Sequence, residues 1–145
     1  TLMVGFPGEK EEHFDKLLHD VKRLQFDWLG VFTYSREKNT PAYSLPEQVP
    51  FKVKEERKRE ILRVQESITL RKNEERKGKT YPVMVDTTFR NGKVEAEGHT
   101  VFQAPEIDGK AFFRKDYLEG SIFPGKVKEL RGSFDIFVVA EARGE

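Results

Sequence analysis

The segment Gly5-Phe6-Pro7-Gly8-Glu9 is the first part of the chain whose composition could support ligand chemistry. Glycine-rich loops between a strand and a helix hold phosphates because their backbone amides can approach the ligand closely. This loop lacks the Lys-Ser/Thr pair of a P-loop and the three-glycine spacing of a dinucleotide site. A tight turn between a strand and a helix is the simpler interpretation, and a phosphate or nucleotide loop is the alternative.

Other side chains that could do chemistry are few. Glu106 and Asp108 are two nearby acids that could act as general acid and base, but the proline and glycine beside them favour a turn. The three histidines do not have the spacing of a metal site, because two of them lie six residues apart and the third lies in another predicted element. We therefore expect neither a catalytic group nor a metal site within this chain.

The sequence of 145 residues contains no cysteine. This excludes disulfides, thiol catalysis and cysteine-bound zinc or iron–sulfur clusters within the chain. No apolar run approaches the roughly 18 residues of a membrane span, and no secretory leader is visible, so we expect a cytoplasmic protein without a membrane partner. The chain starts at Thr1 and enters an apolar run at once, which indicates a cut N-terminus.

The first third has the pattern of a strand–helix–strand unit. Leu2-Met3-Val4 is a short apolar run that predicts a strand buried on both faces, and residues 26–32 form a second one. Between them, apolar residues recur at helical spacing: Phe14, Leu17, Leu18, Val21 and Leu24. Acidic residues precede this stripe, where the helix dipole favours them. The spacing predicts a βαβ unit.

The middle of the chain predicts a connection followed by one long helix. Residues 35–50 carry three prolines, whereas residues 51–77 contain neither glycine nor proline and end at Gly78. A narrow apolar stripe marks the predicted helix: Val53, Ile61, Val64 and Ile68, with Leu62 beside it.

After Gly78 the pattern changes to short strands. Five strand candidates are visible: 81–89, 94–102, 110–113, a stretch near 126–130, and 134–140. Turn signals separate them: Asn91-Gly92, Asp108-Gly109, Pro124-Gly125 and Gly132-Ser133. Such spacing predicts a small closed β-barrel of the OB or SH3-like kind. Its phenylalanines alternate with polar residues, which favours a core over a base-stacking surface.

Two parallel strands and one helix cannot bury a parallel sheet, so the first third is expected to be the end of a larger α/β sheet or barrel. Ligands bind at the carboxyl ends of the strands in such folds. Here these ends are the loop Gly5–Glu9 and the segment Thr33–Ser35.

These segments together resemble the radical-SAM methylthiotransferase family. The resemblance over residues 1–78 is carried by Val4–Glu9, Leu29–Ser35, Thr40–Tyr43, Gln48–Pro50 and Glu56-Arg57. The part after Gly78 resembles the TRAM domain of that family. Within it, Gly98-His99-Thr100 and Ala104–Gly109 are similar to the RimO branch.

The resemblance implies a fold of three parts: the C-terminal end of a radical-SAM α/β barrel (1–47), a connecting amphipathic helix (48–78) and a five-stranded, OB-like TRAM barrel (79–145). It also implies S-adenosylmethionine and two four-iron clusters as cofactors of the full-length parent. A radical made from S-adenosylmethionine takes a hydrogen from the substrate, and sulfur and a methyl group follow. The resemblance places Met3, Gly5, Phe32 and Tyr34 at the adenine. This chain supplies no cluster ligand, so the missing N-terminal part of the enzyme must do so, and the fragment alone should be inactive.

The RimO branch modifies an aspartate of a small-subunit ribosomal protein, and its sister branch modifies a tRNA adenosine. Residues 79–145 carry ten basic and eleven acidic residues, a net charge of −1. A slightly acidic module suits a basic ribosomal protein better than RNA, so nucleic acid is the less favoured partner. Glu106 and Asp108 would contact that protein. The alternatives are the tRNA branch and a free-standing RNA- or protein-binding module.

Overall fold

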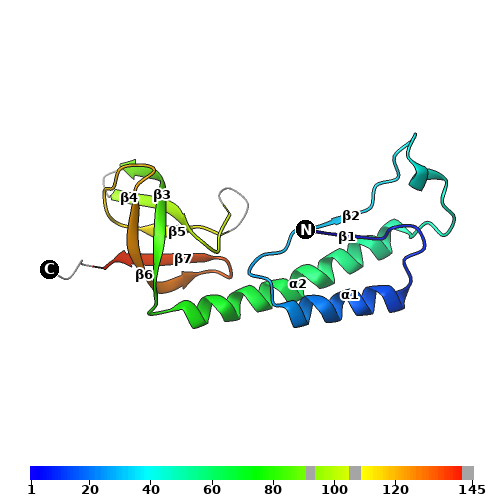
Figure 1. Cartoon of the computed structure of the whole chain (residues 1–145), viewed down its shortest axis with the longest axis horizontal. Helices are drawn as coiled ribbons and strands as arrows, with labels where there is room; N and C mark the ends of the chain where they lie inside the picture. Colours follow the sequence, from blue (N-terminus) through cyan, green and yellow to red (C-terminus); the bar gives the residue numbers. More distant parts are fainter. Residues whose placement is uncertain (91–93, 105–108, 142–145) are drawn as a thin grey trace. The chain divides into compact units, whose positions relative to one another are not determined.

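A computed structural model of the chain describes residues 1–90, 94–104 and 109–141. The chain divides into two compact units, Thr1–Ile68 and Thr69–Glu145, which are described separately. The long helix α2 (Phe51–Arg76) begins in the first unit and ends in the second (Figure 1). Across the described part of the chain, no helix is both long and apolar enough to span a membrane.

The first unit contains the predicted βαβ arrangement. Strand β1 (Leu2–Val4), helix α1 (Glu11–Leu24) and strand β2 (Val31–Thr33) precede the short 3-10 helix η1 (Pro41–Ser44) and the start of α2. The two strands pair in parallel, with Met3 opposite Phe32. The prediction of a strand over residues 26–32 was wrong at its start. Because β1 is only three residues long, β2 finds partners only from residue 31 onward.

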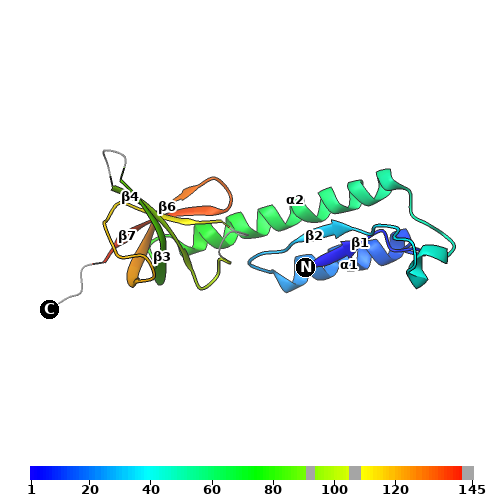
Figure 2. The same ribbon diagram turned by 90° about the horizontal axis from the view of Figure 1, so that it is seen from above.

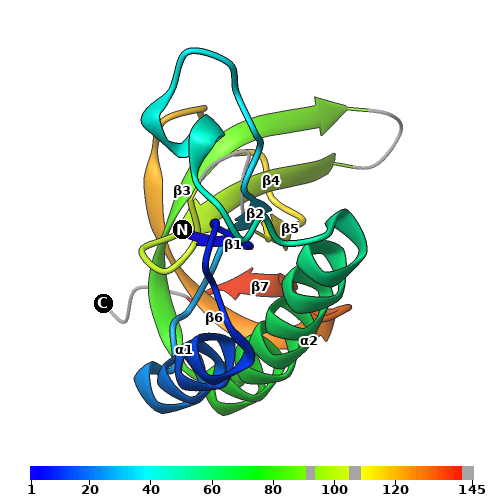
Figure 3. The same ribbon diagram turned by 90° about the vertical axis from the view of Figure 1, so that its right-hand side faces the viewer.

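The core of the first unit lies between the strands and the two helices. It consists of Val4, Phe14, Leu18, Val21, Leu29, Ile61 and Ile68. Figure 3 shows α1 lying beside α2 in this unit. The helices cover one face of the strands, and on the other face Met3 and Phe32 are 40% and 48% exposed, so this chain alone does not bury both faces as predicted.

The second unit is a closed barrel in the order β3-β4-β5-β7-β6, which confirms the five predicted strands. Figure 2 shows β3, β4, β6 and β7 of this barrel. The strands are β3 (Thr80–Arg90), β4 (Val94–Thr100), β5 (Ala111–Phe113), β6 (Ile122–Arg131) and β7 (Asp135–Ala140). All pairs are antiparallel except β5 with β7. The predicted turn at Asn91-Gly92 lies outside the described residues.

The prediction of a turn at Pro124-Gly125 was wrong, because both residues lie inside β6. Pro124 faces Pro82 of β3, so a residue without an amide hydrogen pairs with another. A Cβ on Gly125 would lie 2.6 Å from Val83 Cγ2, so glycine serves close packing here rather than a turn.

The aromatic residues of the barrel divide between its inside and its surface. Phe113 and Phe123 belong to the buried core, and their rings meet edge to face at 4.8 Å. Phe112 and Phe137, paired across β5 and β7, are only half-buried. The expectation that the phenylalanines form the core is therefore confirmed for the first pair but not for the second.

Replacing Gly98 by alanine should destabilise the barrel by an amount at the upper end of about 1–3 kcal/mol. A Cβ at this position would lie 2.0 Å from the backbone oxygen of Met84, which cannot rotate away. Urea unfolding followed by the methyl NMR signals of Val83 and Val138 measures the loss. Gly132→Ala is the control, because no atom lies within 4 Å of a Cβ at this position and only the φ of +73° opposes alanine. This backbone strain should cost about 1 kcal/mol. Equal losses for the two variants would contradict the packing argument.

Candidate ligand site at the strand ends of the first unit

The carboxyl ends of β1 and β2 meet at one edge of the first unit. The amide of Tyr34 donates to the carbonyl of Val4 at 2.8 Å, which extends the parallel pairing by one residue beyond the strands. The loop Gly5–Glu9 leaves the same edge toward α1. This is the edge where α/β folds bind their ligands.

The structure brings together the residues that the family resemblance predicts to lie at the adenine. Met3 and Phe32 are partners in the strand register and form an exposed apolar pair. Gly5 and Tyr34 directly follow the two strands, and Tyr34 is buried with its ring edge-on to Phe6 at 5.3 Å. Their contact with a cofactor stays a prediction.

The loop Gly5–Glu9 is a tight turn whose amides are largely occupied. Gly5 and Gly8 have φ angles of +76° and +84°, which favour glycine. The amide of Gly5 donates to Glu9 Oε2 at 3.0 Å, and that of Gly8 donates to the carbonyl of Glu47 at 3.0 Å. The amide of Glu9 donates to the carbonyl of Phe6 at 2.9 Å. These bonds favour the turn over a phosphate-binding loop.

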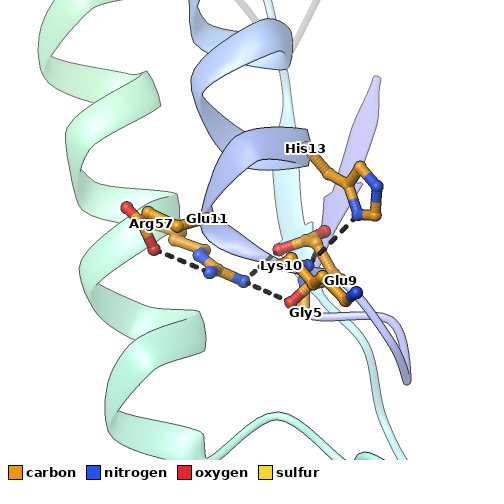
Figure 4. A network of polar contacts seen from close by, with 6 residues as sticks. All are labelled: Gly5, Glu9, Lys10, Glu11, His13 and Arg57. Carbon is orange, nitrogen blue, oxygen red and sulfur yellow. Dashed lines mark hydrogen bonds and ion pairs between the residues drawn. The ribbon is translucent and has the colours of Figure 1, made fainter.

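Arg57 of α2 holds this loop to the helix (Figure 4). Its guanidinium donates to Glu9 Oε1 at 2.7 Å and to Glu11 Oε2 at 2.9 Å, and to the backbone carbonyl of Glu9 at 3.2 Å. The Arg57 side chain is 7% exposed and that of Glu9 is 13% exposed. Burial lowers the pKa of Arg57, but the hydrogen bonds to Glu11 and Glu9 outweigh it, and the net shift is upward. The guanidinium therefore stays charged.

A second buried cation lies one turn earlier on α2. Lys54 is 8% exposed, and its ammonium donates to the backbone carbonyl of Tyr34 at 2.9 Å. The same ammonium lies 4.9 Å from the centre of the Tyr34 ring. Lys54 and Arg57 thus approach the strand edge from the same face of the helix.

Sequence reasoning missed these two cations because it followed apolar residues. The face of α2 that lies against the first unit contains Lys54, Arg57 and Gln65 in addition to Ile61 and Ile68. One signal was available in the sequence. The apolar stripe has a gap of seven residues, 54–60, between Val53 and Ile61, so polar residues must fill the intervening turns of the buried face.

The second unit carries a groove of 380 Å³ on the β3–β4 side of the barrel. Its lining includes a hydrogen bond between Asp86 and His99 Nδ1 at 2.9 Å and an ion pair between Glu97 and Lys110 at 2.8 Å. The hydrogen bond to Glu97 raises the pKa of Lys110, although burial opposes the shift. The ammonium of Lys110 therefore stays charged at neutral pH, and it loses its proton only when the pH rises through that raised pKa.

The predicted contact residues Glu106 and Asp108 lie outside the described residues. Ala104 and Gly109, which flank the segment 105–108 in sequence, both line the groove. Within the described ranges, no group of three or more His, Asp or Glu side chains is arranged to hold a metal ion.

No family model matches the chain, but three of its curated relatives all have the same name. The chain is 44% identical over 147 residues to the ribosomal protein uS12 methylthiotransferase RimO of a Synechococcus species, covering 99% of this chain and 30% of that protein. The RimO of Aquifex aeolicus is 42% identical over 90% of this chain and 31% of its own length. That of Acetivibrio thermocellus is 47% identical over 78% of this chain and 25% of its own length. The chain spans about 30% of the length of the curated relatives it matches.

Proposed function

Because this chain belongs over nearly its whole length to the family of the RimO methylthiotransferases, we propose that it is part of an enzyme that methylthiolates an aspartate of ribosomal protein uS12. The identity of 42–47% to three relatives named for this activity carries the proposal. The test is to incubate the full-length parent with uS12 and to locate an added methylthio group on an aspartate by mass spectrometry. Modification of a tRNA adenosine instead would overturn it.

The proposal assigns a role to each part of the chain. Residues 1–47 form the C-terminal end of a radical-SAM barrel, residues 48–78 the connecting helix, and residues 79–145 the OB-like TRAM domain. The parallel pair β1–β2 and the closed five-stranded barrel support this division. The exposed pair of Met3 and Phe32 supports it too, since further strands and helices of a complete barrel would cover such a face.

The strand edge of the first unit suits S-adenosylmethionine. Met3 and Phe32 offer an apolar surface for the adenine, and Tyr34 has a buried hydroxyl without a hydrogen-bond partner among the described residues. The stem of Lys54 fills the space beside Gly5, where a side chain would collide with it. When bound, S-adenosylmethionine supplies the radical and the methyl group, and the iron–sulfur clusters supply electrons and sulfur. Other parts of the parent must provide the cluster thiolates, since this chain has none.

The TRAM domain is proposed to recognise the protein substrate, with Glu106 and Asp108 as contacts. A ribosomal protein that binds RNA is cationic, and acidic side chains on the barrel would attract it. The groove on the β3–β4 side supports the proposal, because Ala104 and Gly109, which flank this segment in sequence, line it together with Asp86 and Glu97. Since the substrate belongs to the ribosome, we place the enzyme in the cytoplasm.

Replacing Glu106 by glutamine in the full-length parent should slow association with uS12 severalfold and flatten its salt dependence. The change removes one charge and keeps the side-chain shape, so thermal stability should hardly move. Stopped-flow association at two or more salt concentrations measures the effect. Glu129→Gln is the matched control, since it removes the same charge from an exposed position on β6. Equal rates for both variants would count against the docking role.

One observation favours a second function, RNA binding by the barrel. The guanidinium of Arg131 lies 5.0 Å from the ring centre of Phe112 and 4.9 Å from that of Phe137, and Arg114 lies 5.7 Å from Phe137. Arginine and aromatic groups that lie side by side are typical of surfaces that bind single-stranded nucleic acid. Tighter binding of tRNA than of uS12 to the parent would favour this function.

A further inference from the structure

We propose that the ammonium of Lys54 and the hydroxyl of Tyr34 form a receptor for a carboxylate at the strand edge of the first unit. The proposal rests on the proposed function, because that function identifies the two carboxylates that could occupy it. One is the amino-acid carboxylate of S-adenosylmethionine, and the other is the side chain of the substrate aspartate.

Lys54 has unused hydrogen-bonding capacity in a buried position. An ammonium group has three donors, and here the carbonyl of Tyr34 accepts one of them at 2.9 Å. The Tyr34 ring, 4.9 Å away, stabilises the charge but does not replace an anion. Among the described residues, no carboxylate lies within ion-pair distance of Lys54. A buried charge without a counter-charge is costly, so an anion that enters here gains a desolvated partner.

Tyr34 adds a second, independent sign of a missing partner. The residue is nine-tenths buried, and its hydroxyl has no hydrogen-bond partner within the described part of the chain. Buried hydroxyl groups in folded proteins are nearly always hydrogen-bonded, so an orphaned one calls for a ligand. A carboxylate matches both groups chemically, because it accepts hydrogen bonds from an ammonium and from a hydroxyl alike.

The two cations on this face of α2 differ in availability. Arg57 is already bound to Glu9 and Glu11, so its charge is balanced within the unit. No acid of the described residues is paired with Lys54 in this way. The free charge at this edge is therefore that of Lys54.

The buried position of the Lys54 side chain depends on the absence of a side chain at Gly5. A Cβ on Gly5 would lie 2.3 Å from Lys54 Cγ and 2.8 Å from its Cδ. A lysine in the first turn of a helix would ordinarily extend into water, as Lys52 does with a side chain 87% exposed. The glycine thus lets the Lys54 stem cross the loop and bring its ammonium to the strand edge.

The test uses the full-length parent with Lys54→Met, which keeps an unbranched stem and removes the charge, and Tyr34→Phe, which removes only the hydroxyl. Lys52→Met is the matched control, since this exposed lysine lies on the same helix. Calorimetry measures binding of three probes: S-adenosylhomocysteine, methylthioadenosine, which lacks the carboxylate, and uS12 with aspartate or asparagine at the modified position. Binding is read without turnover.

If the cofactor carboxylate occupies the receptor, Lys54→Met weakens the binding of S-adenosylhomocysteine about 10- to 100-fold, and Tyr34→Phe weakens this binding less. Methylthioadenosine then binds all variants equally. If the substrate aspartate occupies the receptor, the two variants weaken the binding of uS12 instead, and this effect disappears when uS12 carries asparagine at the modified position. Either pattern supports the receptor.

The receptor is overturned if folded Lys54→Met binds every probe as tightly as the wild-type parent and Lys52→Met do. Lys54 would then serve only to hold the carbonyl at the end of β2. A wild-type parent that binds neither S-adenosylhomocysteine nor uS12 would disprove the proposed function, and the receptor with it.

Discussion

Replacing Arg57 by methionine should destabilise the first unit by about 3–5 kcal/mol, the usual cost of removing one partner from a buried ion pair. The variant leaves the Glu9 carboxylate, 13% exposed, without the cation that balances it. The same carboxylate accepts the amide of Gly5, so the loop at the strand edge should loosen together with its contact to α2. Urea unfolding followed by the fluorescence of Trp28, the only tryptophan, measures the change.

Two variants separate the buried pair from ordinary surface charge effects. Arg57→Lys keeps the charge but loses the planar fork that reaches two acids, so it should recover only part of the stability. Arg23→Met removes an exposed pair with Asp20 at 3.2 Å and should cost less than about 1 kcal/mol. If Arg57→Met were no more costly than Arg23→Met, the bridge would not be what holds the loop.

The elements that the sequence predicted well are those with one dominant periodic signal. Phe14, Leu18 and Val21 are all buried on α1, because helical spacing and a single core leave no other arrangement for them. The five strands of the barrel alternate buried and exposed residues, as β6 and β7 do along most of their length. Local pattern and tertiary burial agree in these elements.

The sequence failed where burial serves something other than an apolar core. Lys54 and Arg57 are buried through partners 20 and 48 residues away, Tyr34 and Glu9, and no local window contains both members of such a pair. Pro124-Gly125 has the composition of a turn, yet its place in β6 depends on Pro82 and Val83 across the barrel. Long-range contacts decided each of these positions.

In the candidate site, too, the sequence predicted the features with a local signal and missed those that depend on long-range contacts. Glycine in a strand-to-helix loop is a local signal, and the parallel pairing of Met3 with Phe32 follows from the βαβ pattern. The sequence therefore predicted that the loop Gly5–Glu9 and the segment after the second strand lie at one edge of the sheet, as they do in the structure. It did not reveal the two cations of α2 at that edge, because a Lys/Arg-rich helix is usually a solvated face.

The 145-residue chain by itself should bind no iron–sulfur cluster and should not methylthiolate uS12. The full-length parent should bind its clusters and methylthiolate uS12. Iron–sulfur clusters need thiolate ligands, and this chain contains no cysteine that could provide them. Both proteins are incubated anaerobically with iron and sulfide, desalted, and examined by visible absorbance and iron analysis, and uS12 is then analysed by mass spectrometry. The parent is the positive control for the reconstitution. A stoichiometric cluster on the short chain would contradict the assignment of the cluster ligands to the rest of the enzyme. Methylthiolation of uS12 by the short chain without a cluster would contradict the proposed mechanism as well, since none of its residues explains such a reaction.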